Sequence, residues 1–183
     1  MAIPLVPCTV MLITTFVNAQ SIFLLRDPEY FDIDEDDLGK ISSLLILVAL
    51  PGAMIGTFAG GYIFDIVGRR MTLFACFFGG SLFVFIIPFT APNVVPGLLL
   101  VRILITFFTS SPASNPLLAD YVHKDAIGIG AALIGLGFIV GEVLSMAILF
   151  PLTDNLSREY AFMTVAIVGA ASSFVFLFLV KEP

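Results

Sequence analysis

The sequence contains no tryptophan, one histidine, two cysteines and few charged residues, and each scarcity excludes a class of protein. Charged residues make up 12% of the 183 residues and hydrophobic residues 59%, with a mean hydropathy of +1.09. Soluble domains contain about 25% charged and about 45–50% apolar residues, so this composition indicates an integral membrane protein in a lipid bilayer. The eight basic residues leave a net charge of -6, which argues against a nucleic-acid partner because phosphate binding needs clustered cations.

Recognisable chemistry is also scarce. Cys8 and Cys76 lie within apolar segments, where a thiol behaves as a small hydrophobe, so they do not indicate a redox compartment. No nucleotide-binding sequence, metal cluster or nucleophile–base arrangement is present. We therefore expect no enzymatic activity, no cofactor and no metal, and we expect any transport to be driven by a gradient and not by ATP.

Apolar segments long enough to cross a bilayer are abundant; a crossing helix needs about 20 residues. The sequence predicts six such helices, near residues 3–25, 40–62, 71–90, 96–118, 126–151 and 160–180. The first segment lacks a basic leader and is too long for a signal core, so we expect it to be a membrane helix. Short connections make consecutive helices antiparallel. The predicted fold is a single all-α transmembrane bundle over residues 1–183.

The main polar loop, residues 26–37, contains seven acidic residues and one basic residue. The spacing of Asp32, Asp34 and Asp36 resembles a calcium loop. However, the sixth position is Asp37 where an EF-hand needs glycine, and the twelfth is Ser43 where it needs glutamate. We therefore expect a solvated loop whose last acids lie at the N-terminus of the next helix, where the helix dipole favours negative charge.

The six predicted helices repeat in character after the third. Helices one and four each have a polar face, helices two and five are rich in glycine, and helices three and six are rich in phenylalanine. A three-plus-three inverted repeat of this kind is typical of secondary transporters, with the first members lining the solute path and the third members facing lipid. The predicted cavity residues are Thr14, Asn18, Ser21, Arg102, Thr106 and Thr109. Bonding to a neighbouring helix would explain the polar faces equally well.

Glycines at helical spacing predict close helix contacts. Gly52, Gly56 and Gly60 form one stripe on helix two, and Gly137 and Gly141 lie on helix five. We expect the Gly52–Gly56–Gly60 face to need a partner outside this bundle: a second six-helix half, a second copy of the chain or an unrelated membrane protein.

Two charges interrupt the predicted membrane helices, Arg102 on helix four and Glu142 on helix five. A buried arginine needs a counterion or a wet path. At about 1.5 Å per residue, the two side chains differ in depth by only about 5 Å, which predicts an Arg102–Glu142 pair. Such a pair could be a proton or substrate-charge site or a purely structural ion pair.

A compact charged turn connects helices two and three, with the pattern Gly61-x-x-x-Asp65-x-x-Gly68-Arg69-Arg70. Gly61 and Gly68 would permit close backbone approach or positive φ. The turn resembles the signature of the major facilitator superfamily, at the position where that family carries it. The resemblance covers the whole chain and implies the N-terminal six-helix half of a twelve-helix transporter.

By this resemblance, Asp65 and Arg69 would form a conformational latch with Asp120, the acid that ends helix four, and with a helix of the other half. The alternative is that these charges only set topology and cap helices. Arg102 also matches the family, which often has an arginine in the outer part of helix four. Glu142 departs from it, because many antiporters of the family have proline at this position.

The expected orientation places both termini and the Arg69–Arg70 turn on the cytoplasmic side, or on the matrix side. Four basic residues are then inside and three outside, a weak majority under the positive-inside rule. The leading hypothesis is a secondary transporter, or half of one, that moves a small solute by alternating access. The second is a non-transporting six-helix subunit of a larger membrane complex.

Overall fold

The computed structural model describes residues 2–113, 118 and 122–180, and the regular elements within them are all helical. The first three crossings are α1 (Ala2–Arg26), α2 (Glu35–Val67) and α3 (Arg69–Ile86), which the short 3-10 turn η1 (Ile87–Thr90) extends. The second three are η2 (Val94–Leu98) with α4 (Leu99–Ala113), then η3 (Lys124–Ala126) with α6 (Ile127–Leu144), η4 (Ser145–Leu149) and α7 (Phe150–Thr153), and finally α8 (Arg158–Leu179).

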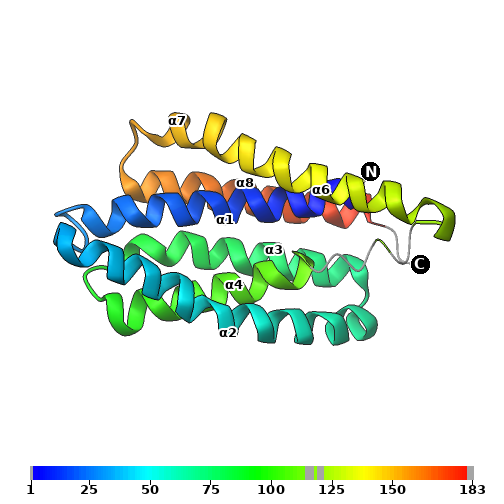
Figure 1. Cartoon of the computed structure of the whole chain (residues 1–183), viewed down its shortest axis with the longest axis horizontal. Helices are drawn as coiled ribbons and strands as arrows, with labels where there is room; N and C mark the ends of the chain where they lie inside the picture. Colours follow the sequence, from blue (N-terminus) through cyan, green and yellow to red (C-terminus); the bar gives the residue numbers. More distant parts are fainter. Residues whose placement is uncertain (1, 114–117, 119–121, 181–183) are drawn as a thin grey trace.

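Six helical stretches in the described part of the chain are long and apolar enough to cross a membrane. The predicted helix count is therefore confirmed, and the protein is an integral multi-pass membrane protein. In Figure 1 the N-terminal end of α1, the C-terminal end of α8 and the turn between α2 and α3 all lie at one end of the bundle. This arrangement follows from an even number of antiparallel crossings.

The second helix begins five residues earlier than the predicted residue 40, at Glu35. The Asp34 carboxylate accepts a hydrogen bond of 2.8 Å from the Glu35 backbone N–H, and Glu35, Asp36 and Asp37 occupy the first turn. Negative charge there interacts favourably with the helix dipole. The acidic loop therefore ends by starting a helix, as the sequence predicts.

The first helix of each three-helix repeat packs with the second and third helices of the other repeat. α1 packs against α6 and α8 of the second repeat, whereas α4 packs against α2 and α3 of the first. Figure 1 shows α6, α8 and α1 on one side of the bundle and α2, α3 and α4 on the other. Contacts between α3 and α8 and between α1 and α4 join the two sides. The all-α inverted-repeat bundle that the sequence predicts is the observed fold.

The glycine stripe on α2 lies against α4 of the same chain, so the expectation of an outside partner for this face is wrong. An added Cβ at Gly52 would lie 2.6 Å from the Ile103 carbonyl oxygen, and a Cβ at Gly60 would collide with Ser111. The absence of side chains lets the two backbones approach this closely. We call this contact between α2 and α4 a glycine seam. A second glycine seam joins α6 to α1, where Gly137 and Gly141 lie against backbone carbonyls of α1.

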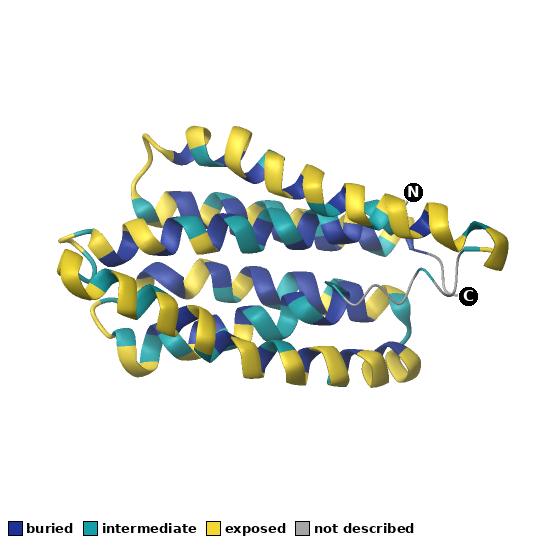
Figure 2. Ribbon diagram, viewed as in Figure 1, coloured by how far each residue is buried: buried dark blue, intermediate teal, exposed yellow. Residues whose placement is uncertain are grey.

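The phenylalanine-rich third helix is not simply lipid-facing, which corrects a second expectation. α3 packs between α8 and α4, and half of its most apolar stretch is buried inside the bundle. Phe77 stacks on Phe176 of α8 with ring centroids 4.9 Å apart, and Phe83 stacks on Phe108 of α4 at 5.7 Å. The aromatic rings of α3 and α8 therefore stabilise the junction between the two repeats. In Figure 2, buried positions are more frequent on the ribbons of α1, α3 and α8 than on those of α2 and α6 at the outside of the bundle.

Candidate functional site

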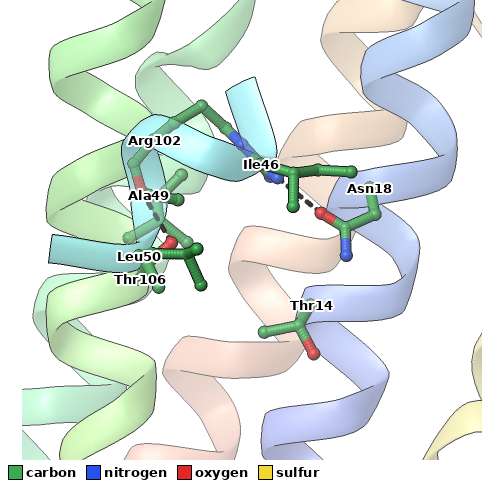
Figure 3. Close-up of a pocket in the computed structure, with 8 residues that line it drawn as sticks. Thr14, Asn18, Ile46, Ala49, Leu50, Arg102 and Thr106 are labelled. Carbon is green, nitrogen blue, oxygen red and sulfur yellow. Dashed lines mark hydrogen bonds between the residues drawn. The ribbon is translucent and has the colours of Figure 1, made fainter. Parts of the chain in front are cut away.

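Arg102 lies at the centre of the candidate site, on the face of α4 that is turned toward α1. Its side chain is buried, with 6% of the residue surface exposed. One terminal nitrogen, Nη2, donates a 2.5 Å hydrogen bond to Oδ1 of Asn18 on α1, and Figure 3 shows this bond crossing the gap between the two helices. The Nε–H of Arg102 has no hydrogen-bond partner within the described ranges.

A cavity of about 200 Å³ adjoins the Arg102–Asn18 bond. Its walls come from α1, α2 and α4, and the lining residues are Thr14, Asn18, Ile46, Ala49, Leu50, Arg102, Ile105 and Thr106. Ile46 and Leu50 of α2 are 58% and 54% exposed, so the cavity opens at the molecular surface beside these two side chains. A second cavity, of about 110 Å³, lies next to it and is also lined by Asn18, Ile46 and Arg102.

The predicted cavity residues divide into three groups in the structure. Thr14, Asn18, Arg102 and Thr106 line the larger cavity, and Ser21 lines the smaller one. Thr109 lines neither; it is buried, and its hydroxyl donates to the Ile105 carbonyl at 2.9 Å. The apolar lining residues Ile46, Ala49, Leu50 and Ile105 were not predicted, because nothing distinguishes them in the sequence from other aliphatic residues.

The hydroxyl groups that line the larger cavity donate to their own helices. Thr14 donates to the Val10 carbonyl at 2.8 Å, and Thr106 donates to the Arg102 carbonyl at 2.9 Å. A hydroxyl that uses its hydrogen in this way retains lone pairs that can accept hydrogen bonds. The larger cavity therefore offers a solute two hydroxyl acceptors and one guanidinium donor.

The predicted Arg102–Glu142 pair is wrong. Glu142 is exposed on α6, the helix that packs on α1 through Gly137 and Gly141, whereas Arg102 bonds to Asn18 on the α4 side of α1. The prediction compared only the depths of the two side chains in the membrane. Depth does not specify which helices are neighbours, and here α1 lies between the two residues.

In the charged turn between α2 and α3, Gly68 has the positive φ that the sequence predicts, and Asp65 and Arg69 are in contact. Gly68 has φ of 96°, a value that side-chain-bearing residues rarely adopt. Arg69 Nη1 donates to Asp65 Oδ1 at 3.0 Å, and the guanidinium lies 5.7 Å from the centroid of the Phe64 ring. Asp120, the proposed third member of the latch, lies outside the described residues.

The signs of these charges are opposite to those that cap helices. Asp65 is near the C-terminal end of α2, and Arg69 and Arg70 are in the first turn of α3. The helix dipole disfavours an acid at the C-terminal end and a base at the N-terminal end. The Asp65–Arg69 bond offsets both effects, so helix capping alone does not account for the turn.

Gly61 does not behave as the sequence predicts. It lies inside α2, and an added Cβ would meet no atom within 4 Å. The close approach expected at this glycine does not occur within the described chain.

A further polar cluster at the opposite end of the bundle was missed by the sequence prediction. Arg158, at the start of α8, donates to Asp27 Oδ2 at 3.3 Å and to Gln20 Oε1 at 3.4 Å. Its guanidinium lies 5.5 Å from the Phe23 ring centroid. Burial, followed by the negative charge of Glu159, raises the pKa of Tyr30 in the same region. The cluster attaches the acidic loop to α8, and no local sequence signal connects residues 131 positions apart.

Together, the six-helix bundle and its central polar cavity define one helical unit of a membrane transporter fold. A family model described as the Major Facilitator Superfamily matches residues 5–183. The chain belongs to the Major Facilitator Superfamily.

Two known proteins illustrate the similarity. Glycerophosphoinositol permease 1 of Candida albicans is 30% identical over 160 residues, which cover 80% of this chain and 29% of the permease. The xylose transporter XylE from E. coli, in a partially occluded inward-open conformation, has a TM-score of 0.76 at 18% identity, and the match covers 99% of this chain and 49% of XylE. A second XylE structure, bound to 6-bromo-6-deoxy-D-glucose, has a TM-score of 0.73 and is covered over 44% of its length. The chain thus spans half or less of the length of these proteins.

Proposed function

We propose that this chain forms the N-terminal half of a secondary transporter, which moves a small solute by alternating access and is driven by a solute or ion gradient. The observation that carries the proposal is the cavity between α1, α2 and α4, where a buried arginine and two threonines line a space open at the surface. A cavity with one open side can receive a solute and can be closed by a second helical bundle.

We infer that a second six-helix half covers the open side of the cavity. The chain accounts for 49% of XylE, which leaves room for an equal second part in a protein of that size. A second copy of this chain is the alternative way to complete the cavity. The exposed Ile46 and Leu50 at the cavity opening would be buried by either one.

The solute is proposed to be a small polyhydroxylated molecule. The two relatives are named for glycerophosphoinositol and for xylose, and both compounds carry several hydroxyl groups. The hydroxyl acceptors of Thr14 and Thr106, together with the Arg102–Asn18 pair, suit such a molecule because they supply both donors and acceptors.

Uptake by the complete gene product, reconstituted in liposomes, tests this function. A panel of radiolabelled polyols, pentoses and glycerophosphodiesters would be offered with and without an imposed proton or sodium gradient. We expect saturable uptake of at least one compound, exchange against the unlabelled compound, and loss of accumulation when the gradient is collapsed. Binding-competent protein that neither exchanges nor accumulates any compound would overturn the proposal.

The Asp65–Arg69 bond is proposed to act as one part of a latch that stabilises one conformation. Asp65→Asn removes the charge at constant size and is expected to change the transport rate while the affinity for solute is retained. The matched control is Asp37→Asn, which removes an exposed acid paired with Lys40 at the other end of α2. Equal effects of the two substitutions on transport would contradict the latch.

The side of the membrane is also a proposal: the end of the bundle that contains Gly68 and the start of α1 is cytoplasmic. Single cysteines at Lys124 and at Ser157, introduced into a chain without Cys8 and Cys76, would lie at opposite ends. We expect an impermeant maleimide added outside cells to label the cysteine at 157 and not the one at 124. The reverse labelling would contradict this orientation.

The alternative of a non-transporting structural subunit loses one of its two supports. It rested on the length of six helices, which supply only one wall of a cavity, and on the Gly52–Gly56–Gly60 face, whose three glycines all contact α4. Purification of a stable multiprotein complex without solute exchange would favour this alternative.

A further inference from the structure

Among the residues that the structure describes, none supplies a counterion to Arg102 in the cavity that it lines. Its hydrogen-bond partner, Asn18, is a neutral amide, and its Nε–H is buried without a partner among the described residues. Of the side chains that line the two cavities, Arg102 is the one that carries a charge. A buried charge is costly unless it is paired, so this arrangement favours an incoming group with the opposite charge.

The acids on the surrounding helices are engaged elsewhere or distant. Glu35 and Asp37 lie in the first turn of α2. Glu35 pairs with Arg26 of α1, and Asp37 pairs with Lys40. Asp37 is five residues before Ser42, the first residue of α2 that lines either cavity, which corresponds to about 7 Å along a helix, and nine residues before Ile46 of the larger cavity. At the other end of α2, Asp65 bonds to Arg69. Glu142 is exposed on α6, on the other side of α1.

We infer that Arg102 is an anion-recognition residue and that the solute of this protein carries an oxyanion group, either a phosphate or a carboxylate, which binds Arg102 in the cavity. This inference rests on the proposed transport function and specifies its substrate class. An oxyanion in the cavity can accept hydrogen bonds from the terminal N–H groups of Arg102, and paired bonds of this kind are the geometry that guanidinium groups form with carboxylates and phosphates. Asn18 holds the guanidinium toward α1 without neutralising it, so the charge remains available.

The hydroxyl groups beside Arg102 agree with one anionic group on a polar body. Thr14 and Thr106 can accept hydrogen bonds from the hydroxyls of the solute, because their own hydrogens are directed to the backbone. A neutral polyol could use these acceptors but would leave the charge of Arg102 uncompensated. The two interactions together distinguish an anionic polyol from its neutral parent.

Binding by the complete gene product in detergent tests the inference with probes that differ by one group. Glycerol 3-phosphate and glycerate are each compared with glycerol, and inorganic phosphate is included to test whether a phosphate is sufficient without the polyol. At least one of the two anions is expected to bind about tenfold tighter than glycerol or more, the factor that one charge-assisted hydrogen bond supplies. The phosphate and carboxylate arms distinguish the two oxyanions.

Substitutions at Asn18 test the role of the charge without removing Arg102. Asn18→Asp places a carboxylate against the guanidinium and is expected to abolish the preference for the anionic probe. Asn18→Leu is the matched control, because it removes the amide at similar size and adds no charge, and it is expected to retain the preference. Arg102→Gln is expected to lose the preference for the anion, and Arg102→Lys is expected to retain part of it. If either variant fails to fold, the comparison of Asn18→Asp with Asn18→Leu decides.

The outcomes separate this inference from the proposed function. Saturable transport of neutral solutes with no preference for either anion would overturn the anion site and leave the transporter intact. Equal preferences in Asn18→Asp and Asn18→Leu would also overturn it. Failure to bind or exchange any compound, anionic or neutral, would instead contradict the proposed transport function.

Discussion

α4 forms two very different contacts on its two sides. Toward α2 it meets a glycine stripe, and the backbones approach so closely that an added Cβ would collide at Gly52, Gly56 and Gly60. Toward α1 it presents Arg102, and a cavity of about 200 Å³ remains beside the Asn18 bond. The glycine seam fixes the position of α4, and a helix held rigidly on one side can carry a buried charge and an unfilled space on the other.

The largest effect is expected from filling the α2–α4 seam. Gly56→Leu would force a side chain against the Phe107 carbonyl and Ser110, and overpacking against a backbone costs about 3 kcal/mol or more. At Gly61, five residues along the same helix, an added Cβ meets no described atom within 4 Å, so Gly61→Leu should be tolerated. Thermal unfolding in detergent, read by size-exclusion fluorescence, measures both. Equal loss of folded protein would mean that the seam does not hold α4.

A smaller effect of the same kind is expected at the second seam. Gly141→Ala places one methyl group against the Cys8 carbonyl and should destabilise the bundle by about 1–2 kcal/mol. Gly135→Ala on the same helix has open space and should be neutral or slightly stabilising, since alanine is the better helix former. Melting temperatures of the two variants give the comparison. If Gly141→Ala leaves the melting temperature unchanged, the contact between α6 and α1 contributes less to stability than the contact between α2 and α4.

On the cavity side of α4, a substitution should change binding and not stability. Thr106→Val removes a hydroxyl that lines the cavity and is expected to weaken solute binding by about fivefold, the value of one neutral hydrogen bond of about 1 kcal/mol. Thr109→Val, three residues on, removes a buried hydroxyl bonded only to its own helix and should leave the affinity unchanged. Isothermal titration with the transported solute measures both. A larger loss of affinity in Thr109→Val would place the site elsewhere on α4.

The smallest effect is expected between Arg102 and Glu142, which α1 separates. Residues without a shared partner have coupling energies below about 0.5 kcal/mol, so the stabilities of Arg102→Gln, Glu142→Gln and the double variant should be additive. A double-mutant cycle of four unfolding measurements, on the unsubstituted protein and the three variants, tests this. Coupling above about 1 kcal/mol would restore the ion pair that the sequence predicts.

Several parts of the candidate site could be predicted from the sequence because they depend on spacing along one helix. Thr14 and Asn18 are four residues apart on α1, as are Arg102 and Thr106 on α4, and all four line the cavity. Gly68 was predictable because its neighbours demand a tight turn. The apolar walls were not predictable, because Ile46 and Leu50 resemble many other aliphatic residues of the chain.

The errors concern contacts between helices. The sequence shows that one face of α2 is small, but the surface that occupies this face belongs to α4, about 50 residues away. The sequence indicated that Arg102 needed a partner and predicted Glu142 from its depth alone, whereas the observed partner is Asn18, on a different helix. The Arg158–Asp27 bond joins α8 to a loop near the other end of the sequence, and the residues of either segment alone do not predict this contact.

By itself, the sequence determined the number of membrane crossings, the acidic residues at the N-terminal end of α2, the positive φ of Gly68 and the small or polar faces of the first, second, fourth and fifth crossings. These properties follow from length, hydropathy and helical spacing, which are local. Only the tertiary structure decided that the first helix of each repeat packs with the other two helices of the opposite repeat. It also decided that Arg102 bonds to a neutral amide and that a cavity remains beside this bond. Those properties depend on which helices are neighbours. Helices with equally apolar faces could be paired in several ways, and only the packing of the whole bundle selects one of them.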